Sequence, residues 1–85
     1  MKLLFSEQAW EDYQFWLATD KAVLRRVNQL IRDTARDPFQ GIGKPEPLRH
    51  SLKGYWSRRI TEEHRLVYRV DGDVLLLAQL RYHYE

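Results

Sequence analysis

Residues 55–81, YWSRRITEEHRLVYRVDGDVLLLAQLR, contain three runs in which the side-chain character changes with a period of two. This period is typical of strands, because successive side chains point to opposite faces of a sheet. We predict strands at 55–60, 65–70 and 74–81, joined by turns at 61–64 and 71–73. Short turns make neighbouring strands antiparallel. The nearly unbroken apolar run at 74–78 indicates that the third strand lies at the sheet centre.

The N-terminal half has a different period. Residues 2–5 are typical of a short strand, and Ser6 is a suitable N-cap for a helix over residues 7–18. Apolar side chains in residues 21–36 recur every three to four positions, which predicts an amphipathic helix. Asp37-Pro38 ends that helix, because the residue before proline avoids helical geometry.

These elements predict an α+β fold, in which two N-terminal helices pack on one face of a small antiparallel sheet. We expect the opposite face to be open and to carry Arg58, Arg65 and Arg69. The chain has 85 residues, so we predict a single domain over residues 1–85. It has no cysteine, which excludes disulfides and thiolate metal sites and fits a cytoplasmic protein. No segment is apolar enough for a signal peptide or a membrane span.

Charge is distributed unevenly along the chain. Residues 1–40 carry six basic and six acidic side chains, whereas residues 44–69 carry seven basic and three acidic ones, a net charge of +4. Five of those seven are arginines, whose planar guanidinium suits paired contacts to phosphate. This segment therefore favours a polyanionic partner such as RNA over a merely solvated surface.

Residues 38–47, PFQGIGKPEP, contain two Gly and three Pro, so we predict an irregular, constrained loop. Pro45 and Pro47 flank Glu46 and hold its backbone extended. A carboxylate held in this way loses little entropy when it is used.

RNA cleavage without a metal needs a base for the 2′-OH, a cation for the phosphorane and an acid for the departing 5′-oxygen. Side chains of these types are present in the C-terminal half: Glu46, Arg59, Arg65, His83 and Tyr84. Their spacing alone does not separate a catalytic set from solvated surface residues. The three histidines lack the close spacing of metal ligands, so we expect neither a metal nor a cofactor.

Other side chains have two interpretations each. Trp10, Tyr13 and Trp16 belong either to the core or to a dimer surface. Tyr55 and Trp56 border the basic segment and either pack in the core or stack on RNA bases. The arginines of the second helix form its solvated face or meet ribosomal RNA or an acidic peptide; they are Arg25, Arg26, Arg32 and Arg36.

Three stretches closely resemble the YoeB toxins of the RelE superfamily: KPEPLRH at 44–50, GYWSRRITEEHRLVY at 54–68 and RYHY at 81–84. The Trp-x-x-Tyr-x-x-Trp spacing at 10–16 and the pair Asp33-Thr34 with Pro38-Phe39 are similar to the same family. The resemblance covers essentially the whole chain. One difference is Arg49, where a lysine is expected in the family; the charge is kept but the donor geometry differs.

The resemblance implies a microbial-ribonuclease-like fold and a ribosome-dependent endonuclease that cuts mRNA in the ribosomal A site. It implies that Glu46 is the general base, Arg65 the phosphate stabiliser and His83 the general acid, with Tyr84 orienting the substrate or assisting the acid. The basic segment would bind the RNA, through Lys44, Arg49, His50, Lys53, Arg58 and Arg59.

The same resemblance implies inhibition by a YefM-type antitoxin encoded nearby, and a homodimer when the toxin is free. The partners expected are therefore mRNA, the bacterial ribosome and the antitoxin, and no membrane. The alternative is a non-catalytic RNA-binding or ribosome-binding module that uses the same basic sheet.

Overall fold

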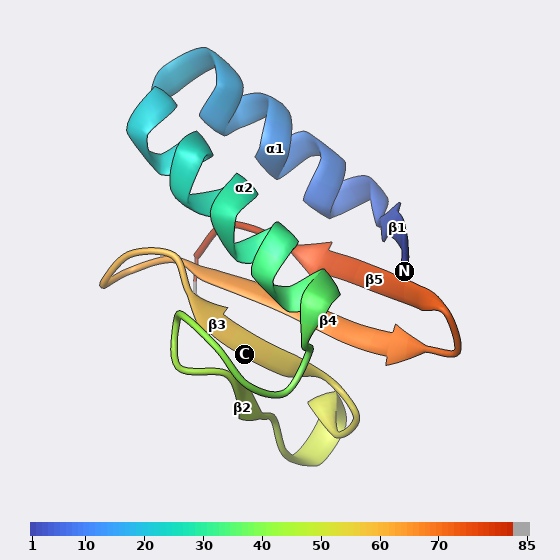
Figure 1. Cartoon of the computed structure of the whole chain (residues 1–85). Coiled ribbons are helices and arrows are strands. Elements are labelled where there is room, and N and C mark those ends of the chain that lie inside the picture. Colours follow the sequence, from blue (N-terminus) through green and yellow to red (C-terminus); the bar gives the residue numbers. More distant parts are fainter. Residues whose placement is uncertain (83–85) are drawn as a thin grey trace.

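The structure, a computed structural model, describes residues 1–82. The predicted site residues His83 and Tyr84 lie outside the described residues. Two helices lie side by side on one face of a sheet (Figure 1). The elements in chain order are β1 (Lys2–Phe5), α1 (Glu7–Thr19), α2 (Lys21–Arg36), β2 (Glu46–Pro47), the 3-10 helix η1 (His50–Leu52), β3 (Trp56–Arg59), β4 (Arg65–Asp71) and β5 (Val74–Gln79).

Both predicted helices are confirmed, and their ends have the expected caps. Ser6 Oγ accepts a hydrogen bond from the Ala9 backbone N–H at 3.0 Å, so it satisfies a donor that the first turn of α1 leaves free. Asp20 serves α2 in the same way through Ala22 and Val23. The bounds of α2 match the prediction, because its apolar period and both of its ends are local features of the sequence.

Among residues 1–82 the sheet has five strands in the order β1-β5-β4-β3-β2. The three C-terminal strands β3, β4 and β5 pair antiparallel as predicted, but β1 pairs parallel with β5, which makes the sheet mixed. The α+β class with two helices on one face is confirmed. The prediction that the third strand, β5, lies at the centre is wrong: β4 is the middle strand, because β2 adds to the far edge beyond β3.

The core lies between the helices and one face of the sheet. It is built from apolar side chains of both layers: Ala9, Trp16, Val27, Leu30, Ile31, Ile60, Leu66, Tyr68, Leu75, Leu77 and Leu80. Burial of such side chains is the main stabilising term for a chain of this size. Neither α1 nor α2 has the length and apolar character that a membrane crossing requires, and this statement covers residues 1–82.

A β-bulge interrupts the pairing of β4 and β5. Tyr68 pairs with Leu77, but the preceding residue, Val67, pairs with Gln79, so Ala78 is the extra residue. Without the bulge Gln79 would point to the same face as Leu77. With the bulge, Gln79 points to the open face and Leu80 returns to the core. The predicted strand 74–81 therefore ends at Gln79.

Candidate functional site

Glu46 lies on an edge strand rather than in a loop. Residues 38–45 are irregular as predicted, but Glu46 and Pro47 form β2 and pair with Ser57 and Trp56 of β3. An edge position tolerates proline, because an edge strand has one side on which no ladder hydrogen bond is needed. The extended backbone expected from the flanking prolines is thus used for pairing. It fixes the register of the exposed Glu46 side chain on the sheet.

The register places Glu46 on the same helix-free face as two arginines. Glu46 is opposite Ser57, and Ser57 is opposite Val67, so these side chains form one row across the sheet. Two residues along β3 and β4, Arg59 is opposite Arg65. Residues two apart on a strand share a face. One carboxylate and a pair of guanidinium groups therefore lie in adjacent rows of the same face.

Arg65 is held by the turn between β3 and β4. Its Nη1 donates to the carbonyl oxygens of Thr61, Glu62 and His64 at 2.8, 3.1 and 3.1 Å. These bonds order a long side chain before any ligand arrives, which lowers the entropy cost of binding an anion. Arg59 is exposed, and its backbone N–H donates to the Gly43 carbonyl oxygen at 2.7 Å.

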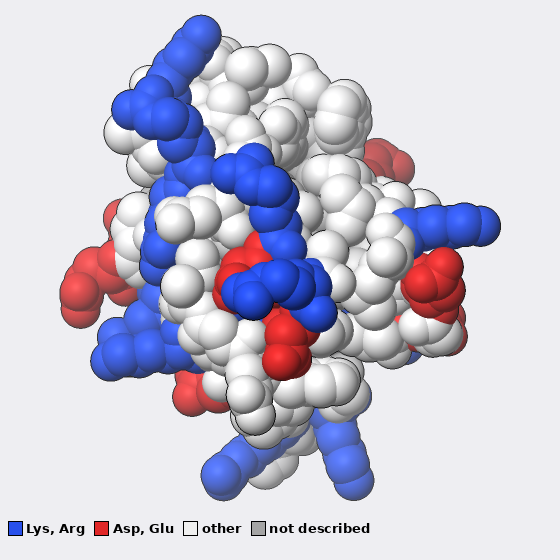
Figure 2. Space-filling model, in the orientation of Figure 1, with Lys and Arg blue, Asp and Glu red and all other residues white. Residues whose placement is uncertain are grey.

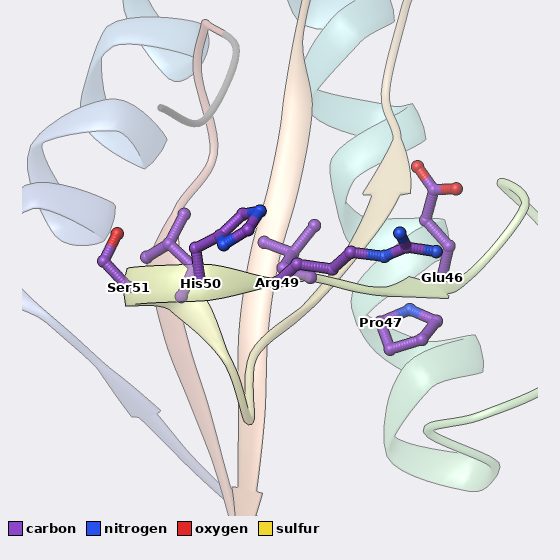
Figure 3. A pocket seen from close by; sticks show the side chains of 7 residues that line it. Glu46, Pro47, Arg49, His50 and Ser51 are labelled. Carbon is purple, nitrogen blue, oxygen red and sulfur yellow. The ribbon is translucent and has the colours of Figure 1, made fainter.

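A pocket of about 590 Å³ borders the carboxylate and is lined by the continuous segment 46–52. Figure 3 shows the Arg49 side chain extending along this segment toward Glu46, while the His50 ring and the Glu46 carboxylate point to the same side. Lys44 and Lys53, at the two ends of this region, are exposed. The predicted base, Glu46, thus lies in or beside one pocket with four of the predicted RNA-binding residues: Lys44, Arg49, His50 and Lys53.

The prediction that Arg58 shares the open face is wrong. Arg58 is fully buried. It is opposite Leu66, and both side chains point toward the helices. Its guanidinium donates to Asp33 Oδ2 at 2.7 Å and to the Ile42, Asp37 and Gln40 carbonyl oxygens at 3.1, 2.6 and 3.1 Å. Its charge holds the loop before Lys44 and is not available to RNA. Arg65 and Arg69 do lie on the open face.

The partners of Arg58 complete a buried polar network. Arg58 Nε donates to the Tyr68 hydroxyl, which donates to the Pro38 carbonyl oxygen at 2.6 Å. Hydrogen bonds from Arg36, the Ile42 backbone N–H and Arg58 lower the pKa of Asp33 from 3.8 to about 2. Burial raises the pKa of the Tyr68 hydroxyl. The network ties α2 and the sheet to residues 37–42, and so fixes the start of the segment that carries Glu46.

Three non-glycine residues among residues 1–82 have left-handed backbones: Lys44, His50 and Tyr82, with φ of 52°, 56° and 64°. This conformation is unfavourable for residues with a Cβ, and it persists where the surroundings enforce it. All three flank or belong to segments predicted for the site. Lys44 and His50 lie on either side of Glu46 in the chain, and Tyr82 directly precedes His83.

The aromatic residues divide between the two interpretations. Trp16 is in the core, whereas Trp10 is 51% exposed and stacks on Tyr13 with ring centroids 5.9 Å apart. Tyr55 lies on the open face under the guanidinium of Arg69, 5.4 Å from ring centroid to Cζ. Trp56 points to the other face and packs against the core.

Basic side chains are not confined to the open face. Figure 2, in which α2 lies toward the viewer, shows Lys and Arg over this helix with acidic side chains set among them. Arg25, Arg32 and Arg36 are exposed there. Charge alone therefore does not choose between the two faces, but the helix-free face carries Glu46 together with Arg59 and Arg65.

Sequence reasoning missed three polar side chains that accept hydrogen bonds from distant backbone N–H groups: Asp12 from Leu80, Asp33 from Ile42 and His64 from Tyr82. Asp12 and Asp33 occupy inward positions of helices, and a carboxylate at such a position signals a buried partner. Within residues 1–82, no group of three His, Cys, Asp or Glu side chains could hold a metal ion.

Residues 5–84 match the family model described as the YoeB-like toxin of bacterial type II toxin-antitoxin systems. This chain belongs to that family. It is 62% identical to Toxin YoeB of Escherichia coli strain K12 over 84 residues, covering 99% of this chain and 100% of the relative. The YoeB-like fold also matches solved structures. A YoeB/ParE toxin from Agrobacterium tumefaciens superposes with a TM-score of 0.96 at 52% identity, covering 99% and 100% of the two chains. A chain of a YoeB-YefM complex from Staphylococcus aureus superposes at 0.91 and 44% identity, covering 99% and 98%.

Proposed function

We propose that this YoeB-like toxin is an endoribonuclease that cuts mRNA in the ribosomal A site without a metal and so stops translation. The observation that carries the proposal is the placement of Glu46 on the open sheet face, in the row next to Arg59 and Arg65. A base and a phosphate-binding cation on one exposed surface are two of the three groups that cleavage at a 2′-OH requires.

In this mechanism Glu46 takes the proton of the 2′-OH, whose oxygen attacks the adjacent phosphorus. Arg65 stabilises the charge of the phosphorane. The three hydrogen bonds from its Nη1 to the turn hold the guanidinium, and its other N–H groups donate to the phosphate. His83 protonates the departing 5′-oxygen, and Tyr84 orients the substrate or assists the acid. The exposed basic residues of the pocket and of β3 bind the RNA strand: Lys44, Arg49, His50, Lys53 and Arg59.

The proposed partners are mRNA, the bacterial ribosome and a YefM-type antitoxin, with a homodimer as the free state in the cytoplasm. One S. aureus relative is described as a YoeB-YefM complex and another, 45% identical, as a YoeB dimer. An acidic antitoxin segment over the open face would cover Arg59 and Arg65 and block the RNA.

The test compares cleavage of a message in programmed ribosomes by the wild type, Glu46→Gln and Glu46→Ala. Loss of the base should lower the cleavage rate roughly 10²- to 10⁴-fold, while binding to the ribosome changes little. Glu11→Gln is the matched control, because it removes the same charge from an exposed position on α1 and should cleave normally.

Equal cleavage by Glu46→Gln and the wild type would contradict the catalytic role and leave the binding module as the better explanation.

Naked RNA provides the second comparison. We expect slow cleavage, because the ribosome would supply the in-line alignment of the 2′-OH and phosphorus. Equal rates on naked and ribosome-bound message would overturn the ribosome dependence alone.

A further inference from the structure

The segment that leaves β5 is held by polar groups of α1. The Leu80 backbone N–H donates to Asp12 Oδ2 at 2.9 Å, and the Leu80 carbonyl oxygen accepts from Trp16 Nε1 at 2.8 Å. Asp12 is 3% exposed and Trp16 is 5% exposed, so solvent hardly competes for these bonds. The chain is thereby fixed to α1 at the residue where the sheet pairing ends.

Two residues later the chain is held again, by the turn between β3 and β4. The Tyr82 backbone N–H donates to His64 Nδ1 at 2.7 Å, and the Tyr82 carbonyl oxygen accepts from the Arg65 backbone N–H at 3.0 Å. Both backbone polar groups of Tyr82 are therefore used. Figure 1 shows the segment after β5 passing beside this turn. Tyr82 makes these two bonds from a left-handed backbone, with φ of 64°.

The His64 ring is itself fixed in place. It packs edge-on against Trp16 with ring centroids 4.9 Å apart, and its side chain is 14% exposed. Because an amide N–H only donates, Nδ1 must carry a lone pair when it accepts from Tyr82, so the ring proton lies on Nε2. Nε2 is 3.6 Å from Glu63 Oε1, a neighbour that favours this tautomer.

We propose that His64 is a positioning residue for RNA cleavage. Its Nδ1 acceptor fixes the backbone of Tyr82, which in the sequence directly precedes the proposed catalytic residues His83 and Tyr84. The adjacent Arg65 links Tyr82 to the proposed site. Its backbone N–H donates to the Tyr82 carbonyl oxygen, and its side chain lies on the open face. This inference rests on the proposed function, in which residues 83 and 84 act on the RNA.

Three substitutions distinguish the role of His64 as a hydrogen-bond acceptor from the role of its ring in packing. His64→Phe keeps a ring against Trp16 and removes the acceptor. His64→Asn replaces the ring but can present its amide oxygen near the position of Nδ1, whereas the longer His64→Gln reaches the position of Nε2 instead. We expect His64→Phe and His64→Gln to lower kcat on programmed ribosomes about tenfold with KM unchanged, and His64→Asn to restore most of it.

The companion measurement is NMR of the Tyr82 amide. In the wild type we expect slow hydrogen exchange and a scalar coupling between the Tyr82 nitrogen and His64 Nδ1. Both should be absent in His64→Phe, with the melting temperature and the other amides of β4 unchanged. A residue that only filled space would show the opposite order of activities, with Phe active and Asn impaired, and that result would overturn the proposal.

The two hypotheses fail differently. An active wild type with an equally active His64→Phe variant overturns the role of His64 alone. A wild type that does not cut the message overturns the proposed function, and the role of His64 falls with it.

Discussion

At the scale of the residue, Arg58 shows how one side chain can be placed wrongly from sequence and still matter for the site. It sits in an arginine-rich stretch, and its neighbour Arg59 is exposed. Yet Arg58 is two residues from Trp56, whose side chain packs against the core, so the two-residue period places both on the inner face. A buried guanidinium is stable there because its N–H groups all find acceptors.

Replacement of Arg58 by lysine should destabilise the fold, because one ammonium group cannot reach all of the acceptors that the guanidinium serves. We expect the free energy of unfolding in urea to fall by about 3 kcal/mol or more. Arg59→Lys, one residue away and exposed, is the control and should change it by less than about 0.5 kcal/mol. Equal effects would show that the network contributes nothing particular to stability.

The carboxylate in the same network predicts a pH dependence. The folded-state pKa of Asp33, about 2, lies below its ordinary value of 3.8, chiefly because of the hydrogen bond from Arg36. A lowered pKa means that Asp33 stabilises the fold fully above about pH 4, and that this contribution disappears as the pH falls toward 2. Urea unfolding of the wild type and Asp33→Asn should therefore differ most above pH 4 and converge near pH 2. A constant difference across this range would contradict the assignment.

At the scale of the element, the loop between α2 and β2 determines where Glu46 lies. Gly43 has φ of 81°, and a Cβ there would lie 2.7 Å from Leu30 Cδ2. Its carbonyl oxygen accepts from the Arg59 N–H. The position therefore needs both the backbone freedom of glycine and its lack of a side chain. The loop approaches the core closely because Arg58 binds three of its carbonyl oxygens.

Gly43→Ala tests this close approach. Gly54→Ala is the matched control, because Gly54 also has a positive φ, 98°, but a Cβ added there would meet nothing within 4 Å. Both variants carry backbone strain, and only Gly43→Ala adds a clash. We expect Gly43→Ala to lose about 1–3 kcal/mol more than the control in denaturant unfolding. A smaller loss than in Gly54→Ala would mean that the loop can move away without cost.

At the scale of the whole molecule, the helices bury one face of the sheet and leave the other for a ligand. Arginines lie on the open face and on α2 alike, so the proposal that RNA binds the open face rests on Glu46 sharing that face with Arg59 and Arg65. A net charge of only +2 gives weak overall attraction to RNA. Local contacts should therefore dominate binding.

The salt dependence of binding to single-stranded RNA distinguishes the two faces. Arg59→Gln should reduce the slope of log K against log salt by about 0.7, the effect of one lost phosphate contact. Arg25→Gln, an equal loss of charge on the helix side, should leave the slope unchanged. The reverse pattern would place the RNA on α2.

The sequence by itself determined the two helices, the three C-terminal antiparallel strands and the residue types of the proposed RNA-cutting site. These depend on periods, caps and turns that act over a few residues, and local geometry is enough to specify them. The motifs from 44 to 84 likewise indicated the family, which the comparison of residues 5–84 then showed.

Only the tertiary structure decided how these parts meet. Glu46 lies on the sheet because β2 pairs with β3, and Gln79 points to the open face because of the bulge at Ala78. Arg58 is buried where its guanidinium can donate to the carbonyl oxygens of the loop. Each outcome depends on partners far apart in the chain. A local period does not specify which distant strand a segment pairs with, or which distant carbonyl group a side chain binds. Such long-range pairing is settled by burial and hydrogen-bond satisfaction in the whole fold.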